Sequence, residues 1–497
     1  MADFKPIIKT QGASIPVDDG QFVVDVQNGE MFLDYANNRI PIGGGSSELP
    51  KFFYECTGVA DDVAVSNISK DFYNPAVGSV WYGVNKLELF VHGNFGFSAS
   101  PQYTAAIQWE STLNIARCIE LGLNEIDDGS NPKELVVNFY NCTFPSLTEQ
   151  QMNPLPVFLY SFNGLAVIAK TTNSVTVKGM RIGITLNASS SDSKKIIGFL
   201  GNGVWEDCAS FFRNGNPTGY TYFYSFVDSL DNSGALYKNC KSKIIHTAGY
   251  GISSYGFCSN GATYINCENN NIITASQGEV RAAGFSGIYL DSSNFTGMTM
   301  GKSKIYNCKA RNDINITTPA TIIAYGVLGG NIVDGGEYFS NVKAAGGQID
   351  IVHGISGTEI VTGGAKGYAY VDRNGYFNGS VVGIYAGTTR PDFGYNITKW
   401  INCEAWAGSI SGYNTGLTVP FAYTDSNTNA ALIMSDCTAV KNSIYTYWNM
   451  DNAVYLAGGM GGKSINNITV DIQYYNTSIS SANVANFYFV IAEREIK

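Results

Sequence analysis

Apolar and polar positions along the chain form short runs that end at a recurring four-residue motif. The motif is a large apolar residue, any residue, Asn or Asp, and then Cys. In a regular strand, residues three apart face opposite sides, yet the first and last residues of this motif are both of core type. A bend between them resolves the conflict, and Asn or Asp suits a bend because both tolerate the left-handed backbone region. The copies are Phe139–Cys142, Trp205–Cys208, Tyr237–Cys240, Tyr264–Cys267, Ile305–Cys308, Trp400–Cys403 and Met434–Cys437, with Phe339–Val342 as an eighth copy in which Val replaces Cys.

The spacing of the motif indicates a structural repeat. From Cys142 onward, with Val342 included, the steps are 66, 32, 27, 41, 34, 61 and 34 residues, and the two longest are about twice the shorter ones. A second marker, Gly followed by Ile or Val, keeps a similar spacing. Repeats of irregular length with fixed strand cores are typical of solenoids, so the sequence predicts a mainly β protein with a parallel β-helix across residues 136–444. The copies of the second marker begin at Gly251, Gly287, Gly326, Gly354 and Gly383.

Two smaller units are predicted before the β-helix. In residues 1–49, β-prone runs flank Asn28-Gly29, a pair that favours a tight hairpin because both turn residues must tolerate positive φ. In residues 50–135, Val65, Ile68 and Phe72 recur at helical spacing, and apolar residues at 87, 89 and 91 alternate as in a strand. We therefore expect a β-hairpin module, then a small α+β domain, and a capping or subunit-contact segment at 445–497.

Composition and charge narrow the classes of function. Only 14% of the 497 residues are charged, against about 25% in an average protein. The net charge of −10 and the lack of a basic cluster in the sequence disfavour nucleic acid as a partner. No apolar run approaches the ~20 residues that span a bilayer, so membrane insertion is not expected. The first residues lack the pattern of a secretory signal, which favours a product made and kept in a cytoplasm.

The ten cysteines are predicted to be reduced core residues. Seven of them lie in the repeated motif, and free Cys packs as a small hydrophobic residue. There is no CxxC pair, and His92, His246 and His353 share no metal-ligand spacing. We therefore expect neither a metal nor a cofactor.

The repeat resembles that of a known fold family. The runs Tyr264–Asn269 and Ile305–Ala310, with Gly287–Leu290 between them, resemble the repeat of pectin-lyase-like right-handed parallel β-helix proteins. This resemblance covers about three hundred residues. It implies a right-handed winding of the predicted β-helix.

The N-terminal residues carry a second resemblance. Residues Gly20–Asp25 and Gly29–Asp34, followed by Asn38-Arg39-Ile40, resemble the opening module of tail-associated proteins of bacteriophages. Together the two resemblances imply a phage tailspike or tail fibre protein that binds bacterial surface polysaccharide as its host receptor. They also imply a homotrimer that is assembled in the host cytoplasm and joined to other tail or baseplate proteins of the virion by its N-terminal region. A secreted bacterial β-helix enzyme or adhesin is a third class, which the lack of a signal disfavours.

The same β-helix could instead carry a polysaccharide depolymerase. Glycoside hydrolysis needs two carboxylates about 5–5.5 Å apart for retention or about 6.5–9.5 Å apart for inversion, and residues one coil apart can meet this condition. A polysaccharide lyase needs a base and a cation that stabilises an enolate. For each candidate the ordinary alternative is a solvated loop charge. The candidates are the carboxylates Glu279, Asp291, Asp334 and Glu337, with Arg281 and Arg311 as anion or sugar contacts.

An aromatic-rich stretch suggests a place for sugar contacts. It runs from Phe211 and Phe212 past Arg213 to Tyr220 and Tyr224. Aromatic faces hold carbohydrate surfaces, so we interpret the stretch as an insertion that forms a glycan groove, with ordinary loop packing as the alternative.

Overall fold

The computed structural model shows a mainly β protein. Its one α-helix among the described residues is α1 (Asp61–Tyr73). The structure describes residues 8–10, 22–25, 30–35, 38–41, 51–98, 103–104, 115–116, 119–122, 133–148, 165–171, 175–186, 194–215, 219–227, 234–259, 261–287, 303–317, 321–373, 375–387, 397–414, 416–424, 431–446, 454–457, 462–467, 469–474 and 488–489.

A small sheet and a large sheet contain most of the strands. In the small four-stranded sheet, β2 and β3 pair antiparallel on either side of the predicted hairpin turn. Its strands are β1 (Ile8–Thr10), β2 (Phe22–Asp25), β3 (Glu30–Tyr35) and β4 (Asn38–Pro41). The large sheet has 25 strands. These are β5 (Lys51–Glu55), β6 (Lys86–Asn94), β7 (Tyr103–Thr104), β8 (Ile115–Ala116), β9 (Ile119–Leu121), β10 (Glu134–Thr143), β12 (Leu165–Thr171), β13 (Val175–Lys178), β15 (Lys194–Gly201), β16 (Val204–Glu206), β18 (Thr221–Val227), β19 (Leu236–Lys238), β21 (Ile252–Cys258), β22 (Thr263–Ile265), β24 (Val280–Ser286), β25 (Lys304–Tyr306), β27 (Thr321–Asp334), β29 (Gln348–Thr362), β32 (Ser380–Gly387), β33 (Ile397–Ile401), β35 (Thr418–Thr424), β36 (Ala431–Ser435), β38 (Val454–Ala457), β39 (Gly462–Asn466) and β41 (Tyr488–Phe489).

A third sheet of 12 strands lies opposite the large one. Its strands pair parallel and in register with the next strand along the stack, as β20 does with β23 and β23 with β26. They are β11 (Ser146–Thr148), β14 (Arg181–Leu186), β17 (Ala209–Asn214), β20 (Lys241–Ala248), β23 (Glu268–Ala275), β26 (Lys309–Ile316), β28 (Glu337–Ala344), β30 (Lys366–Arg373), β31 (Gly375–Phe377), β34 (Glu404–Asn414), β37 (Thr438–Thr446) and β40 (Thr469–Tyr474).

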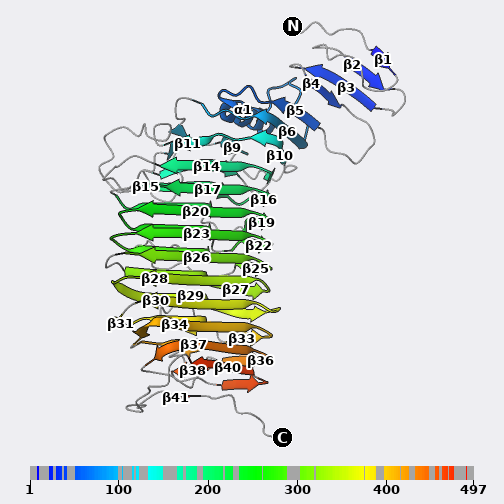
Figure 1. Ribbon diagram of the computed structural model, residues 1–497. Coiled ribbons are helices and arrows are strands. Elements are labelled where there is room, and N and C mark those ends of the chain that lie inside the picture. Colours follow the sequence, from blue (N-terminus) through cyan, green and yellow to red (C-terminus); the bar gives the residue numbers. More distant parts are fainter. Residues whose placement is uncertain are drawn as a thin grey trace.

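The long parallel sheets are compatible with a β-helix, as the sequence predicts at this level. The chain runs through two ladders of the large sheet and then one strand of the 12-stranded sheet before it repeats, as in β18–β19–β20 and β21–β22–β23. We call one such passage a coil. Figure 1 shows the coils stacked from the α1 end toward the C-terminus. Parallel pairing starts at β5 and β6 and continues through β38, β39 and β40.

The corner residue of each predicted motif is left-handed, which confirms the sequence argument. The side chains of successive corners also form a ladder. Asn266 Nδ2 donates to Asn239 Oδ1 at 3.4 Å, and Asn307 Nδ2 donates to Asn266 Oδ1 at 3.0 Å. The backbone φ lies between 50° and 55° at Asn141, Asp207, Asn239, Asn266, Asn307, Asn402 and Asp436.

Glycine forms the corner in coils where the motif was not recognised. Gly179, Gly335 and Gly363 have φ of 73°, 69° and 66°. The predicted eighth copy at Phe339–Val342 is wrong, because these residues lie inside β28 and Asn341 projects from a regular strand. With Gly335 and Gly363 included, the corners from Asn307 to Asn402 are 28, 28 and 39 residues apart, so the repeat is continuous.

The glycine marker corresponds to a real row, but two of its members were assigned wrongly. Gly251 and Gly287 lie just outside β21 and β24, whereas Gly256 and Gly284 are the residues in register. A Cβ atom at Gly256 or Gly284 would overlap Asn269 or Ala310 of the 12-stranded sheet. The two sheets come too close here for a side chain. The row is Gly256, Gly284, Gly326, Gly354 and Gly383.

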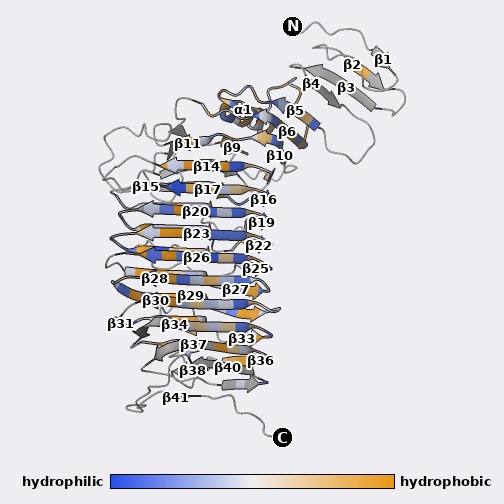
Figure 2. Ribbon diagram, viewed as in Figure 1, coloured by the Kyte–Doolittle hydropathy of each residue, from blue (hydrophilic) through white to orange (hydrophobic). Residues whose placement is uncertain are grey.

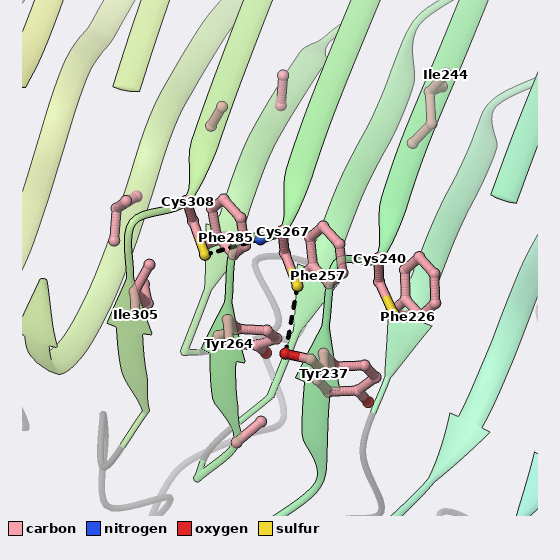
Figure 3. Packing of buried hydrophobic residues seen from close by; sticks show 14 of the residues in the cluster. Phe226, Tyr237, Cys240, Ile244, Phe257, Tyr264, Cys267, Phe285, Ile305 and Cys308 are labelled. Atoms are coloured by element: carbon pink, nitrogen blue, oxygen red, sulfur yellow. Dashed lines mark hydrogen bonds between the residues drawn. The ribbon is translucent and has the colours of Figure 1, made fainter. Parts of the chain in front are cut away.

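Identical aromatic residues stack in the interior at the spacing of the strands. The ring centroids of Phe226 and Phe257 are 4.7 Å apart, and those of Phe257 and Phe285 are 4.8 Å apart, with rings within 8° of parallel. These distances match the ~4.7–4.9 Å between paired strands. Figure 3 shows this column beside the stacked pair Tyr237 and Tyr264.

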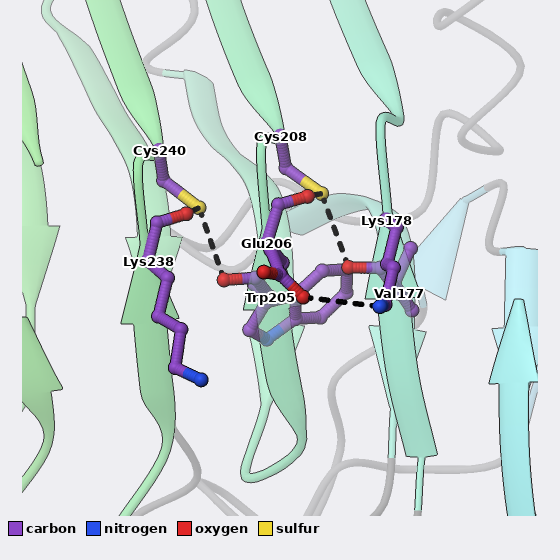
Figure 4. Close-up of polar contacts among 7 residues, drawn as sticks. All are labelled: Val177, Lys178, Trp205, Glu206, Cys208, Lys238 and Cys240. Carbon is purple, nitrogen blue, oxygen red and sulfur yellow. Dashed lines mark hydrogen bonds and ion pairs between the residues drawn. The ribbon is translucent and has the colours of Figure 1, made fainter. Parts of the chain in front are cut away.

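The motif cysteines are protonated donors inside the core. The Cys240 thiol donates to the carbonyl oxygen of Trp205 at 3.3 Å, and the Cys208 thiol donates to that of Val177 at 3.6 Å (Figure 4). Each cysteine therefore bonds the large apolar residue at the equivalent position of the preceding coil. Burial raises the pKa of the Cys240 thiol, which keeps it in the donor form. The motif cysteines are free, and all except the half-buried Cys142 are buried, as predicted.

Helix α1 packs at the N-terminal end of the stack (Figure 1). Val65 and Phe72 are fully buried, which confirms their predicted helical face, and Phe72 joins the same core as Leu89 of β6. Asp61 fixes the start of the helix: its carboxylate accepts hydrogen bonds from Tyr54 Oη at 2.7 Å and from the N–H of Gly96 at 2.7 Å. The helix thus covers apolar residues that an open solenoid end would expose.

Replacing the corner residue Asn266 tests the ladder. We expect Asn266→Ala to lower the free energy of unfolding by about 1–2 kcal/mol, because Ala loses two side-chain contacts and must enter the left-handed region. Asn266→Gly should be less harmful, since Gly adopts this region freely. Guanidinium unfolding would measure both, with Asn315→Ala, an exposed position within β26, as the control. An Ala variant at least as stable as the Gly variant would contradict the argument.

Candidate functional site

One face of the 12-stranded sheet points away from the core. Along β28, Tyr338, Ser340 and Val342 are buried, while the residues between them are partly exposed. This alternation is that of a strand with one face on the core. Because the strands pair in register, exposed residues of successive coils line up in columns along the stack. We call this surface the outer face; the first half of β20, β23 and β26 on it is hydrophilic in Figure 2.

The first column of the outer face alternates in charge. Lys241 Nζ lies 3.6 Å from Glu268 Oε2, and Lys366 Nζ lies 3.9 Å from Glu337 Oε1. Such exposed pairs contribute only about 0–1 kcal/mol each, but opposite charges on neighbouring strands favour the observed register. The column is Lys241, Glu268, Lys309, Glu337, Lys366 and Glu404.

The second column becomes aromatic across β28, β30 and β34. Phe339, Tyr368 and Trp406 are register partners, and the rings of Phe339 and Tyr368 stack with centroids 4.3 Å apart. Tyr370, two residues further along β30, stacks on Trp406 with centroids 5.6 Å apart and planes 20° apart. All four side chains are half-buried, so part of each ring reaches solvent. We call these four residues the aromatic platform.

Hydrogen-bonding groups are held in place beside the platform. Asn341 Nδ2 donates to Asp313 Oδ1 at 2.9 Å, and Arg311 Nε donates to Asp313 Oδ2 at 2.5 Å. The Tyr368 hydroxyl donates to Glu404 Oε1 at 2.9 Å. Burial and this hydrogen bond raise the pKa of Tyr368, so its hydroxyl remains protonated. The outer face therefore offers flat apolar rings flanked by amide, guanidinium and carboxylate groups.

The predicted site residues are distributed over different parts of the fold. Glu337 belongs to the charged column, and Arg311 is the register partner of Phe339, so both adjoin the platform. Asp334 ends β27 at the Gly335 corner, and its carboxylate lies where a Cβ atom of Gly363 would be. Asp291 lies outside the described residues. The structure thus brings Glu337 and Arg311 together near the aromatic rings.

Glu279 and Arg281 form a separate group on the large sheet. Glu279 Oε2 lies 3.0 Å from Arg281 Nε. Burial alone would lower the pKa of Arg281, but the hydrogen bond and charge of Glu279 outweigh it and raise this pKa, with smaller contributions from Tyr255 and Tyr220. The Tyr220 ring lies 4.8 Å from that of Tyr222. Glu279 therefore faces a cation and tyrosines, away from Glu337 on the opposite sheet.

The aromatic-rich stretch is not an inserted loop, contrary to the sequence interpretation. Its residues belong to β17 and β18, which are regular strands of the coil. Phe212 and Phe223 are fully buried and pack with centroids 4.9 Å apart. The platform residues Tyr368, Tyr370 and Trp406, in contrast, were not singled out, although each occupies an alternate position after a corner.

Comparisons with known proteins give no relative: no protein-family model, curated protein or solved structure matches the chain. Within the described residues, no group of three or more His, Cys, Asp or Glu side chains could hold a metal ion. The helix that the structure describes lacks the length and apolar character needed to cross a membrane.

Proposed function

We propose that the chain is a receptor-binding protein of the phage tailspike or tail fibre type, a right-handed parallel β-helix that binds bacterial surface polysaccharide. The assignment to a virion rests on the sequence resemblances of the N-terminal residues and of the repeat. The observation that carries the binding function is the aromatic platform on the outer face.

A polysaccharide matches the platform in shape and chemistry. Sugar rings have apolar C–H faces that pack on aromatic rings, and rims of hydroxyl groups that need hydrogen-bond partners. Phe339, Tyr368 and Trp406 recur once per coil, which places them about 4.8 Å apart along the stack. Asn341 and Asp313 supply a fixed amide and carboxylate beside them. A flat, periodic surface of this kind suits a polymer better than a small molecule, which binds in a concave pocket.

Truncating the platform tests the proposal. Trp406→Ala should weaken polysaccharide binding more than tenfold, because removal of a central aromatic contact costs ~2 kcal/mol or more. Tyr82→Ala, which removes an aromatic side chain that is 59% exposed at a distant site, should leave binding unchanged. Affinity electrophoresis against purified bacterial capsular and O-antigen polysaccharides would measure this. Release of reducing ends or unsaturated uronates in the same samples would reveal a depolymerase, the alternative function.

The controls make the result decisive. Circular dichroism should show that Trp406→Ala keeps the β fold, since the side chain projects from the outer face. If the unaltered protein binds none of the polysaccharides, or if Trp406→Ala binds as tightly as the parent, the proposal is wrong.

A further inference from the structure

The part of the outer face nearer the N-terminus, between β14 and β26, carries an excess of positive charge. Six basic residues project from it, against the two acidic residues Glu268 and Asp313. The whole chain, in contrast, has a net charge of −10. We call this part the cationic half; its basic residues are Arg181, Arg213, Lys241, Lys243, Lys309 and Arg311.

Several of these cations are available to a ligand. Arg213, Lys243 and Lys309 are exposed and form no ion pair within the part of the chain that the structure describes. Lys241 and Arg311 each contact one carboxylate, at 3.6 Å and 2.5 Å, and both are exposed. Exposed charges that are not neutralised by neighbours create a local positive potential, which attracts anions even to an acidic protein.

The cationic half is continuous with the aromatic platform. The column of Phe211, Lys243, Asn270 and Arg311 leads directly to Phe339, the first ring of the platform. Lys243 and Arg311 are two strands apart in this column, as Lys241 and Lys309 are in the first column. Two strand spacings correspond to ~9–10 Å, which is comparable with the length of a disaccharide. A polymer that passes along the face would meet cations at this interval before it reaches the rings.

We infer that the ligand of the outer face is an acidic polysaccharide with an anionic group on about every second sugar. Its anionic groups lie over the cationic half, and its sugar rings stack on the platform. This inference rests on the proposed function and specifies its substrate class. Charge complementarity favours this ligand over a neutral glycan, which would leave Arg213, Lys243 and Lys309 without partners. The cations are spread over parallel strands of a flat sheet, which suits a polymer with regularly spaced charges.

The test compares acidic polysaccharides with neutral forms of the same backbone. The probes are purified capsular polysaccharides whose charge is a carboxylate or a phosphodiester, each paired with its carboxyl-reduced or dephosphorylated form. The parent protein should bind the acidic form at least tenfold more tightly, with an affinity that falls as NaCl rises from 50 to 500 mM. The double variant Arg213→Gln, Lys243→Gln should lose about tenfold toward the acidic form only. Trp406→Ala should weaken binding to both forms, and Lys304→Gln, an exposed lysine on β25, should change neither.

Each contrary outcome identifies what is wrong. If a neutral form is bound as tightly as its acidic parent and Trp406→Ala abolishes this binding, the proposed function holds and the acidic ligand is refuted. If no polysaccharide is bound, both fail. If the double variant alters the sedimentation coefficient without altering polysaccharide binding, the cationic half is a contact between copies of the chain. Preferential binding of a DNA duplex would also overturn the inference.

Discussion

Gly354→Ala is expected to lower the free energy of unfolding by about 3 kcal/mol or more, although it adds a single carbon atom. A Cβ atom at Gly354 would overlap the backbone of Gly367 and Tyr368 in β30 and the carbonyl oxygen of Gly383 in the next coil. These atoms belong to paired strands, so they cannot move aside without breaking ladder hydrogen bonds. Gly354 does not have a left-handed φ, and the loss therefore measures the close approach of the two sheets rather than backbone strain.

Gly249→Ala provides the matched control for this substitution. At this exposed glycine the nearest atom to an added Cβ is Ser276 Oγ at 3.5 Å, an ordinary contact. Guanidinium unfolding should place Gly249→Ala within about 0.5 kcal/mol of the parent protein. If Gly354→Ala proves equally stable, the two sheets are further apart at this row than the structure shows. If Gly354→Ala accumulates only as insoluble protein, the soluble yield of the two Ala variants makes the same comparison.

The corner motif was predictable because one local rule acts at each copy. A residue such as Asn239 must turn the chain in the left-handed region, and the Cys that follows must be small enough for the core and able to donate a hydrogen bond. Both requirements are properties of single residues, so they are visible without alignment of the coils. Gly335 and Gly363 were missed since glycine meets the first requirement equally well but is common elsewhere in the chain.

The aromatic platform and the cationic half could not be read from the sequence in the same way. Tyr368 and Trp406 are 38 residues apart, whereas Phe339 and Tyr368 are 29 apart, so a fixed period does not bring all three into one column. Lys243 and Arg311 are likewise separated by a coil of different length. Only the strand register decides which exposed side chains become neighbours. For this reason the sequence contains no basic cluster although the fold assembles one.

Acid is expected to destabilise the protein through two buried histidines. Burial lowers the pKa of His353 to about 3 and that of His246 to about 4. In the unfolded chain both titrate near pH 6.5. Above that pH each histidine is neutral in both states and contributes nothing to the pH dependence. As the pH falls from about 6.5 toward 4, the unfolded state binds protons that the folded state does not, so stability decreases.

The surroundings of His353 explain why it remains neutral and how the effect can be isolated. Its Nε2 lies 2.8 Å from Ser380 Oγ and its Nδ1 lies 3.2 Å from Ser356 Oγ, while its ring packs between Tyr325 and Tyr385. These neighbours supply hydroxyl groups but no carboxylate to balance an imidazolium. At pH 4.5 the loss should be about 2–3 kcal/mol for each histidine.

Carboxylates titrate in the same pH range, so the contribution of the histidines is best measured as a difference between variants. The test uses His246→Asn, which introduces the residue found at the register position of the preceding coil, Asn214, together with His353→Gln. The guanidinium midpoint of the parent protein should fall more steeply between pH 7.5 and 4.5 than that of either variant, whatever their stabilities at pH 7.5. Parallel pH profiles would mean that the histidines already accept protons in the folded state. Because both residues are buried in coils that border the outer face, such a result would also show that water reaches the interior of the stack where the structure has it closed.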